Sequence, residues 1–174
     1  LLLSLRGSLC LYQGEELGLT EADLSFDQLK DPAGITFWPE YKGRDGCRTP
    51  MPWDGSAQNA GFGEGTTWLP VEAAHLAMAV SAQENDEASV LNFYRKAIAI
   101  RQSNSALKTG GIEVIKADDD VLILRRSSGE ETVVCMYNFG FKPVAVPMEG
   151  EVLLSSSGSA ALGPRGFVWM RVKR

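Results

Sequence analysis

Apolar and polar positions alternate differently in the two parts of the chain. After Gly110-Gly111, short runs of β-type residues are separated by turn residues, such as Asp-Asp-Asp at 118–120 and Ser-Ser-Gly-Glu at 127–130. Strands at this spacing with turn signals between them are typical of an antiparallel sandwich. The pattern predicts strands within residues 112–117, 121–127, 131–139, 142–148, 151–156 and 167–173. We therefore predict a small antiparallel β-sandwich domain over residues 108–174.

The first part, residues 1–107, has the character of an α/β domain. Ser8 to Tyr12 is almost continuously apolar, as in a strand covered on both faces, and Leu1 to Leu5 would end a preceding helix. A helix end followed by a buried strand is the order of a parallel α/β fold. Ser25 is expected to cap a short helix that ends near Pro32.

The clearest helix is predicted from Asp86 to Asn104. Acidic residues stand at its start and Arg101 near its end, as the helix dipole favours. One face, with three- and four-residue spacing, should be buried. It comprises Leu91, Tyr94, Ala97, Ile98 and Arg101.

Residues 33–70 form a long segment without regular periodicity. It is rich in aromatic residues, which argues against disorder, and loops of this length are usually functional. Within it, the stretch GRDGCRTPMPWDG at 43–55 places Arg44, Asp45 and Arg48 among glycines and prolines. Turn chemistry fixes the backbone of such a loop, and fixed loops often carry binding residues.

The composition narrows the classes of partner and of site that we expect. The chain has 17 basic and 22 acidic residues, a formal net charge of −5, and no visible basic face, so a nucleic-acid partner is not expected. No apolar stretch approaches the roughly 18 residues of a membrane span. The cysteines, Cys10, Cys47 and Cys135, lack the C-x-x-C spacing of a zinc site. We interpret them as reduced thiols of a cytoplasmic protein, and we expect no metal site and no cofactor.

Three segments together carry a resemblance to a known family. GSLCLYQGEELGL, then RDGCRTPMPW, then SVLNFYRKAIAIRQ resemble the C-terminal third of the α-glucosidases of glycoside hydrolase family 13, of the oligo-1,6-glucosidase kind. The resemblance covers the chain from Leu1 to Arg174. It implies that residues 1–107 are the end of a (β/α)8 catalytic barrel with an active-site-facing loop, and that residues 108–174 are the family's antiparallel β domain.

The catalytic acids of that family are missing. The family retains configuration with an Asp nucleophile and a Glu acid/base, which lie in motifs of the type GFRxD, a Glu after a strand, and NHD. None of these motifs occurs in the chain, and its one histidine, His75, is expected to be a surface or loop residue. Because the chain also begins in the middle of an apolar pattern, we expect it to be a fragment that is inactive alone.

The resemblance singles out Arg44 as the substrate-binding candidate, with Arg48 as the second. A guanidinium offers a rigid fork of donors to vicinal hydroxyls and to a carboxylate. The alternative is a structural pair of Arg44 with Asp45, and the sequence leaves open which arginine faces the pocket. Asp45 is expected to orient an arginine or cap a turn, and Glu15 or Glu16 to bind an arginine or a backbone amide. Packing is the default for four aromatics: Phe37, Trp38, Tyr41 and Trp53.

The whole protein is thus expected to be a retaining α-glucosidase that hydrolyses terminal α-glucosidic bonds of short oligosaccharides of the maltose, isomaltose or sucrose type. Three alternatives stay open. The protein could be a glucosyl transferase or sucrose isomerase of the same family. It could be a non-catalytic barrel that serves as partner of an amino-acid transporter. The segment could also be a free-standing sugar-binding module, although a cut barrel leaves an unpaired strand.

Overall fold

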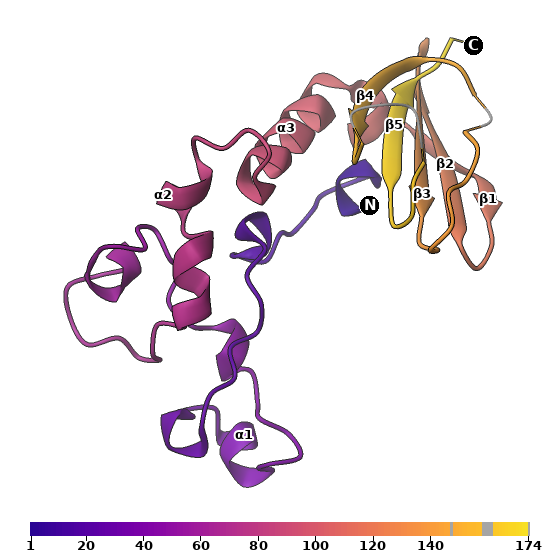
Figure 1. The fold of residues 1–174 in the computed structure, drawn as a ribbon. Coiled ribbons are helices and arrows are strands. Elements are labelled where there is room, and N and C mark those ends of the chain that lie inside the picture. The colour runs from indigo at the N-terminus through magenta and orange to yellow at the C-terminus, as the bar shows by residue number, and fades with distance from the viewer. Residues whose placement is uncertain (147, 158–161, 174) are drawn as a thin grey trace. The chain divides into compact units, whose positions relative to one another are not determined.

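The computed structural model describes residues 1–146, 148–157 and 162–173, which form two compact units. One unit is Leu11–Arg95, and the other combines Leu1–Cys10 with Lys96–Arg174 (Figure 1). Each unit is described by itself. The domain boundary between residues 107 and 108 remains a prediction.

The second of these units contains a five-stranded antiparallel sheet, which confirms the predicted β domain (Figure 1). The strand order is β1-β2-β3-β5-β4, so β1 and β4 form the edges. The strands are β1 (Gly111–Ala117), β2 (Val121–Ser128), β3 (Glu131–Asn138), β4 (Glu151–Ser155) and β5 (Phe167–Arg171).

The predicted strand at 142–148 does not form in the residues described there. Only Val144 makes a β-bridge, to Leu162, and Pro147 lies outside the described residues. Proline has no backbone N–H, and Pro143 and Pro147 therefore cannot donate to a ladder.

The two faces of the sheet are covered by different material. One face packs into an apolar cluster of Val121, Ile123, Val134, Met136, Leu162, Val168 and Met170. The other carries Leu124, Cys135 and Trp169 and packs against the short helix α4 (Ser105–Lys108), whose Ala106 and Leu107 are fully buried. The layer opposite this face is thus helical, whereas the sequence pattern led us to expect a second sheet.

Two buried arginines connect the N-terminal turn η1 (Leu2–Ser4) to the rest of the sheet unit. Arg126 of β2 has no exposed surface and donates to the carbonyls of Leu107 (3.1 Å), Gly110 (3.0 Å) and Gly111 (3.1 Å), and also to that of Ser4. Burial lowers the pKa of this guanidinium from its ordinary value.

Arg101 of helix α3 (Val90–Ser103) also donates hydrogen bonds to backbone carbonyls of the N-terminal segment. Its Nη1 donates to the carbonyls of Leu3 (2.9 Å), Leu5 (2.6 Å) and Leu107 (2.8 Å), and its Nη2 donates to Gly7 (2.6 Å). The predicted inward face of this helix is confirmed at Leu91, Ala97 and Arg101, all of them buried.

The helix begins later than predicted because of a local cap. Ser89 Oγ accepts a hydrogen bond from the Asn92 N–H at 3.2 Å, so residues 86–89 form a turn before the first helical residue, Val90. A serine in this position satisfies one of the free N–H groups at a helix start.

A third polar link buries the hydroxyl of Tyr137. Its Oη donates to Ser4 Oγ at 2.6 Å and accepts from Trp169 Nε1 at 2.8 Å. Burial raises the pKa of this phenol well above its ordinary range, and burial also raises the pKa of the neighbouring Cys135 thiol to about 12. Both groups are therefore neutral and structural.

The unit Leu11–Arg95 consists of single turns and short helices around two small apolar clusters. One cluster comprises Ala22, Leu24, Leu29 and Leu69, and the other Leu17, Met51 and Leu91. The turns and helices are η2 (Glu15–Leu17), η3 (Phe26–Gln28), α1 (Pro32–Thr36), η4 (Asp45–Cys47), η5 (Gln58–Gly61), η6 (Ala73–Met78), α2 (Val80–Gln83) and the first residues of α3.

Two sequence predictions in the first hundred residues are wrong in detail. Ser8–Tyr12 is not a strand, and its residues are exposed or half-buried, because the described strands all lie between residues 111 and 171 and none of them pairs with it. Pro32 begins a helix, since Asp31 caps α1 and proline suits the first helical position. Ser25 does cap η3, with Gln28 completing a capping box.

Among the described helices, none is both long and apolar enough to span a bilayer.

Replacing Arg126 by Met should destabilise the sheet unit. The variant leaves four carbonyls without this donor, three of them buried, and a buried unsatisfied polar group costs about 1–3 kcal/mol. We expect a loss of about 3 kcal/mol or more in the free energy of unfolding, measured by denaturant titration. The adjacent Arg125→Met is the matched control, because Arg125 makes only a half-exposed pair with Glu113 and should cost at most about 1 kcal/mol. Equal losses for the two variants would contradict the assigned role of Arg126.

Candidate functional site

The loop of residues 43–55 is fixed by the buried carboxylate of Asp45. Asp45 is 3% exposed, and its Oδ2 accepts hydrogen bonds from the backbone N–H groups of Lys30 (2.6 Å) and Asp31 (2.7 Å). Gly46 has no room for a side chain, because a Cβ there would lie 2.4 Å from the Ala22 carbonyl oxygen. Asp45 therefore binds backbone amides. The structural pair of Arg44 with Asp45, the alternative considered from the sequence, does not form.

Arg44 is held at its backbone and free at its tip. Its N–H donates to Asp31 Oδ2 at 3.0 Å, and its Nε lies 3.8 Å from the same oxygen, while 67% of the side chain is exposed. Asp31 Oδ1 accepts from the Ala33 N–H at 3.0 Å and so caps α1. The hydrogen bonds from Ala33 and Arg44, aided by the two nearby guanidiniums, lower the pKa of the Asp31 carboxyl.

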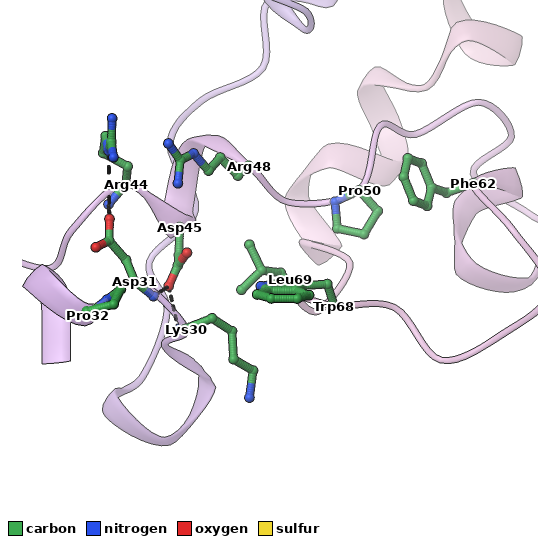
Figure 2. Close-up of a pocket in the computed structure, with 10 residues that line it drawn as sticks. All are labelled: Lys30, Asp31, Pro32, Arg44, Asp45, Arg48, Pro50, Phe62, Trp68 and Leu69. Carbon is green, nitrogen blue, oxygen red and sulfur yellow. Dashed lines mark hydrogen bonds and ion pairs between the residues drawn. The ribbon is translucent and has the colours of Figure 1, made fainter.

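Both predicted arginines line one cavity of about 410 Å³ (Figure 2). Figure 2 shows Arg44 facing Asp31 on one side, and Pro50 and Phe62 on the other side. Arg48 is exposed and makes no ion pair with any residue in the described ranges. The complete lining is Lys30, Asp31, Pro32, Arg44, Asp45, Arg48, Pro50, Phe62, Trp68 and Leu69.

Aromatic side chains form part of this lining. Trp68 is 77% exposed and Phe62 is 51% exposed, so both rings are accessible to a ligand. The sequence analysis did not assign them to the site, although their place in the aromatic segment at 33–70 was a usable signal. The sequence around Lys30 and Asp31 carried no such signal, because it is the hydrogen bonds from their backbone N–H groups to Asp45 that bring them to the loop.

The packing prediction for the other aromatics is correct for one of four. Trp38 packs against the cluster around Leu24 and makes an edge contact with Phe26 at 5.7 Å between ring centroids. Phe37, Tyr41 and Trp53 are instead largely exposed.

Three carboxylates of this unit, those of Glu16, Asp31 and Asp45, serve as structural acceptors. Glu16 Oε2 accepts from the Gly14 N–H at 2.8 Å, which confirms that one of the adjacent glutamates binds a backbone amide. In the cavity, Asp31 and Asp45 are likewise occupied by backbone N–H groups. The arrangement suits the binding of hydroxyls and negative charge, and it presents no pair of free carboxylates for acid/base chemistry.

Two further expectations can be compared with the structure. All three cysteines are free thiols, with Cys135 buried and Cys10 and Cys47 exposed. His75 is not a surface residue: it is 1% exposed, and its Nε2 lies 2.9 Å from the Thr20 carbonyl oxygen. Within the described ranges, no cluster of three or more potential metal ligands occurs.

Comparison with known proteins identifies relatives of the chain. The family described as "Alpha amylase, catalytic domain" matches residues 1–110. A probable alpha-glucosidase of Rhizobium meliloti (strain 1021) is 51% identical over 138 residues, which is 79% of this chain and 25% of that protein. An oligo-1,6-glucosidase of Parageobacillus thermoglucosidasius is 32% identical over 157 residues, 79% of this chain and 28% of that protein.

A solved structure gives the same relationship in three dimensions. The crystal structure of the alpha-glucosyl transfer enzyme XgtA superposes with a TM-score of 0.86 at 44% identity, covering 99% of this chain and 34% of that one. The chain thus spans about a quarter to a third of the length of the relatives it matches.

The Asp31 carboxylate should make the loop sensitive to acid. The pKa of this carboxyl is lowered in the folded protein. Its contribution to the stability of the folded loop is therefore fully present above the ordinary Asp pKa of about 4, and it is lost as pH falls through the lowered value. We expect the hydrogen-exchange protection of the Arg44 amide to fall over that range, and to be low throughout in Asp31→Asn.

The control for this experiment is Asp54→Asn. Asp54 also has a lowered pKa, but its hydrogen bonds hold Ser56 in a separate turn. Protection of the Arg44 amide should stay at the wild-type level in that variant. A wild-type protection factor that does not respond to acid would show that the carboxylate of Asp31 does not hold the loop.

Proposed function

Since this chain belongs to the family of alpha-amylase catalytic domains, we propose that it is the C-terminal part of a retaining α-glucosidase that acts on terminal α-glucosidic bonds of short oligosaccharides. The substrates would be of the maltose, isomaltose or sucrose type. The observation that carries the proposal is the shared cavity of Arg44 and Arg48, on a loop that Asp45 fixes, in a chain half identical to a probable alpha-glucosidase.

Arg44 is proposed to bind the sugar that enters this cavity. Its backbone is anchored by Asp31, while its guanidinium is exposed and can reach vicinal hydroxyls or an acidic residue from another part of the enzyme. A guanidinium that closes one end of the pocket would restrict binding to the terminal glucose of a chain. Arg48, which lines the same cavity, is proposed as the second contact.

The chemical step is proposed to depend on carboxylates outside this chain. Retention requires two carboxyl groups about 5–5.5 Å apart, one a nucleophile and one an acid/base. The two aspartates of the cavity are engaged by backbone amides, which suits positioning and not nucleophilic attack. The segment alone should therefore not hydrolyse glucosides. A cytoplasmic location remains our proposal, based on the three cysteines of the sequence.

A second candidate is glucosyl transfer, which the similarity to XgtA favours. Hydrolysis and transfer share the glucosyl-enzyme intermediate and differ in whether water or another hydroxyl accepts the sugar. Product analysis with maltose alone and with maltose plus an added alcohol would separate them. Glucose as the main product supports hydrolysis, whereas an alkyl glucoside supports transfer.

A chimaera tests the proposal directly. This chain would replace the matching C-terminal quarter of the Rhizobium meliloti protein, which is 51% identical over the aligned residues. We expect the chimaera to cleave a nitrophenyl α-glucoside, and the chain alone to be inactive. The parent protein measured in parallel is the control. A folded but inactive chimaera beside an active parent would contradict the proposal.

Within the active chimaera, Arg44→Ala should lower kcat/KM for maltose by about 100-fold, because it removes a charged donor from the substrate pocket. Arg48→Ala, which removes the other arginine of the same cavity, is the comparison variant and should have a smaller effect. Lys42→Ala is the control, since Lys42 pairs with the exposed Asp23 away from the cavity lining. An unchanged specificity constant for Arg44→Ala, with a large loss for Arg48→Ala, would transfer the role to Arg48.

A further inference from the structure

A second, smaller cavity lies behind the loop that carries the arginines. It measures about 100 Å³ and is separate from the cavity of Figure 2. One part of its wall comes from the loop itself, through Gly46, Cys47, Thr49 and Met51. The remaining wall comes from His75 of η6 and from the segment of residues 12–21, which contributes Tyr12, Gln13, Gly14, Glu15, Leu19, Thr20 and Glu21.

The imidazole in this wall has a defined tautomer. A carbonyl oxygen can only accept a hydrogen bond, so the contact of 2.9 Å between His75 Nε2 and the Thr20 oxygen requires a proton on Nε2. In the neutral ring, Nδ1 is then an acceptor. This nitrogen is buried and has no hydrogen-bond partner among the residues that the structure describes. A buried acceptor of this kind calls for a donor.

The cavity has the size and chemistry to supply that donor. A water molecule takes about 30 Å³ of liquid and needs two to four polar partners when buried. The wall offers a volume of about 100 Å³ and polar groups from both sides, including the Thr49 hydroxyl on the loop. Thr49 is itself only 9% exposed, which places it on the buried side of this wall.

The loop is already held at its other points. Asp45 binds it from the side of residues 30 and 31, and Tyr12 Oη donates to the Cys47 carbonyl at 3.1 Å. Cys47 Sγ in turn donates to the Arg44 carbonyl at 3.1 Å. Gly46 accepts from the Ala22 N–H at 3.0 Å, and Met51 packs with Leu17 and Leu91. Thr49 is the residue of the loop above the small cavity that these contacts do not anchor.

We infer that His75 is a positioning residue for the arginine loop, acting through water held in the cavity beneath residues 46–51; this rests on the proposed role of Arg44. The Nε2–H group anchors the ring to Thr20, and Nδ1 accepts from the water that supports the loop. His75 thereby fixes the position of the Arg44 side chain without contacting the substrate.

Two conservative variants separate the two nitrogens in the active chimaera. Glutamine reaches the place of Nε2 and can keep the bond to Thr20, while it loses the acceptor at Nδ1. Asparagine keeps a polar atom near Nδ1 and loses the bond to Thr20. We expect His75→Gln to raise KM for maltose by about five- to tenfold with kcat changed less than twofold, and His75→Asn to keep KM and lower Tm. Lys116→Ala, on the exposed edge strand β1, should change neither KM nor Tm.

The His75→Gln change is then repeated in the Arg44→Ala background. If His75 acts through Arg44, its effect on KM should disappear there. A wild-type KM for His75→Gln, or a fall in Tm without a change in KM, would overturn the inference, as would an equal rise in KM with and without Arg44. An Arg44→Ala enzyme with unchanged kcat/KM would instead contradict the proposed role of Arg44, independently of His75.

Discussion

The burial of two arginine side chains among backbone carbonyls is the constraint on which the sheet unit depends. Removing a guanidinium from water costs several kcal/mol unless its donors are satisfied. Arg101 and Arg126 donate to seven different carbonyl groups and share that of Leu107. The two cations thus gather the free carbonyls of a turn, a helix end and a strand start at one point. The short segment Leu1–Gly7 is consequently part of the same unit as a sheet more than 100 residues later.

In the other unit, the backbone groups that need partners are N–H groups, and carboxylates accept their hydrogen bonds. Its backbone is mostly single turns, which leave N–H groups without helical or strand partners. Asp31, Asp45 and Glu16 accept hydrogen bonds from such groups. The two aspartates of the arginine cavity and Glu16 are therefore occupied in holding loops. The arginines next to them keep exposed guanidiniums, and the binding capacity of the cavity is accordingly cationic and aromatic.

What the sequence could predict follows from how local each signal is. The sheet strands and the buried face of α3 were predictable because a two- or three-to-four-residue period depends only on neighbours. Gly and Pro marked the loop as a fixed one, and the family resemblance singled out its two arginines. The partners of Asp45 and His75 were not predictable, since they lie 15 and 55 residues away and no pattern connects them. The strand expected at Ser8–Tyr12 failed because a strand requires a pairing partner, which none of the described strands provides.

The same reasoning explains why a histidine can matter here without taking part in chemistry. The proposed contact of the exposed Arg44 with a neutral sugar would contribute most when the position of this side chain is set before the ligand arrives, because ordering a long side chain costs free energy. The backbone on both sides of Arg44 is fixed, by Asp31 at its amide and by Cys47 at its carbonyl. Asp31 in turn donates its own backbone N–H to the buried Asp45, and the Cys47 carbonyl accepts from Tyr12. Specificity in such a pocket is then determined as much by the layer under the loop as by the side chains that meet the sugar.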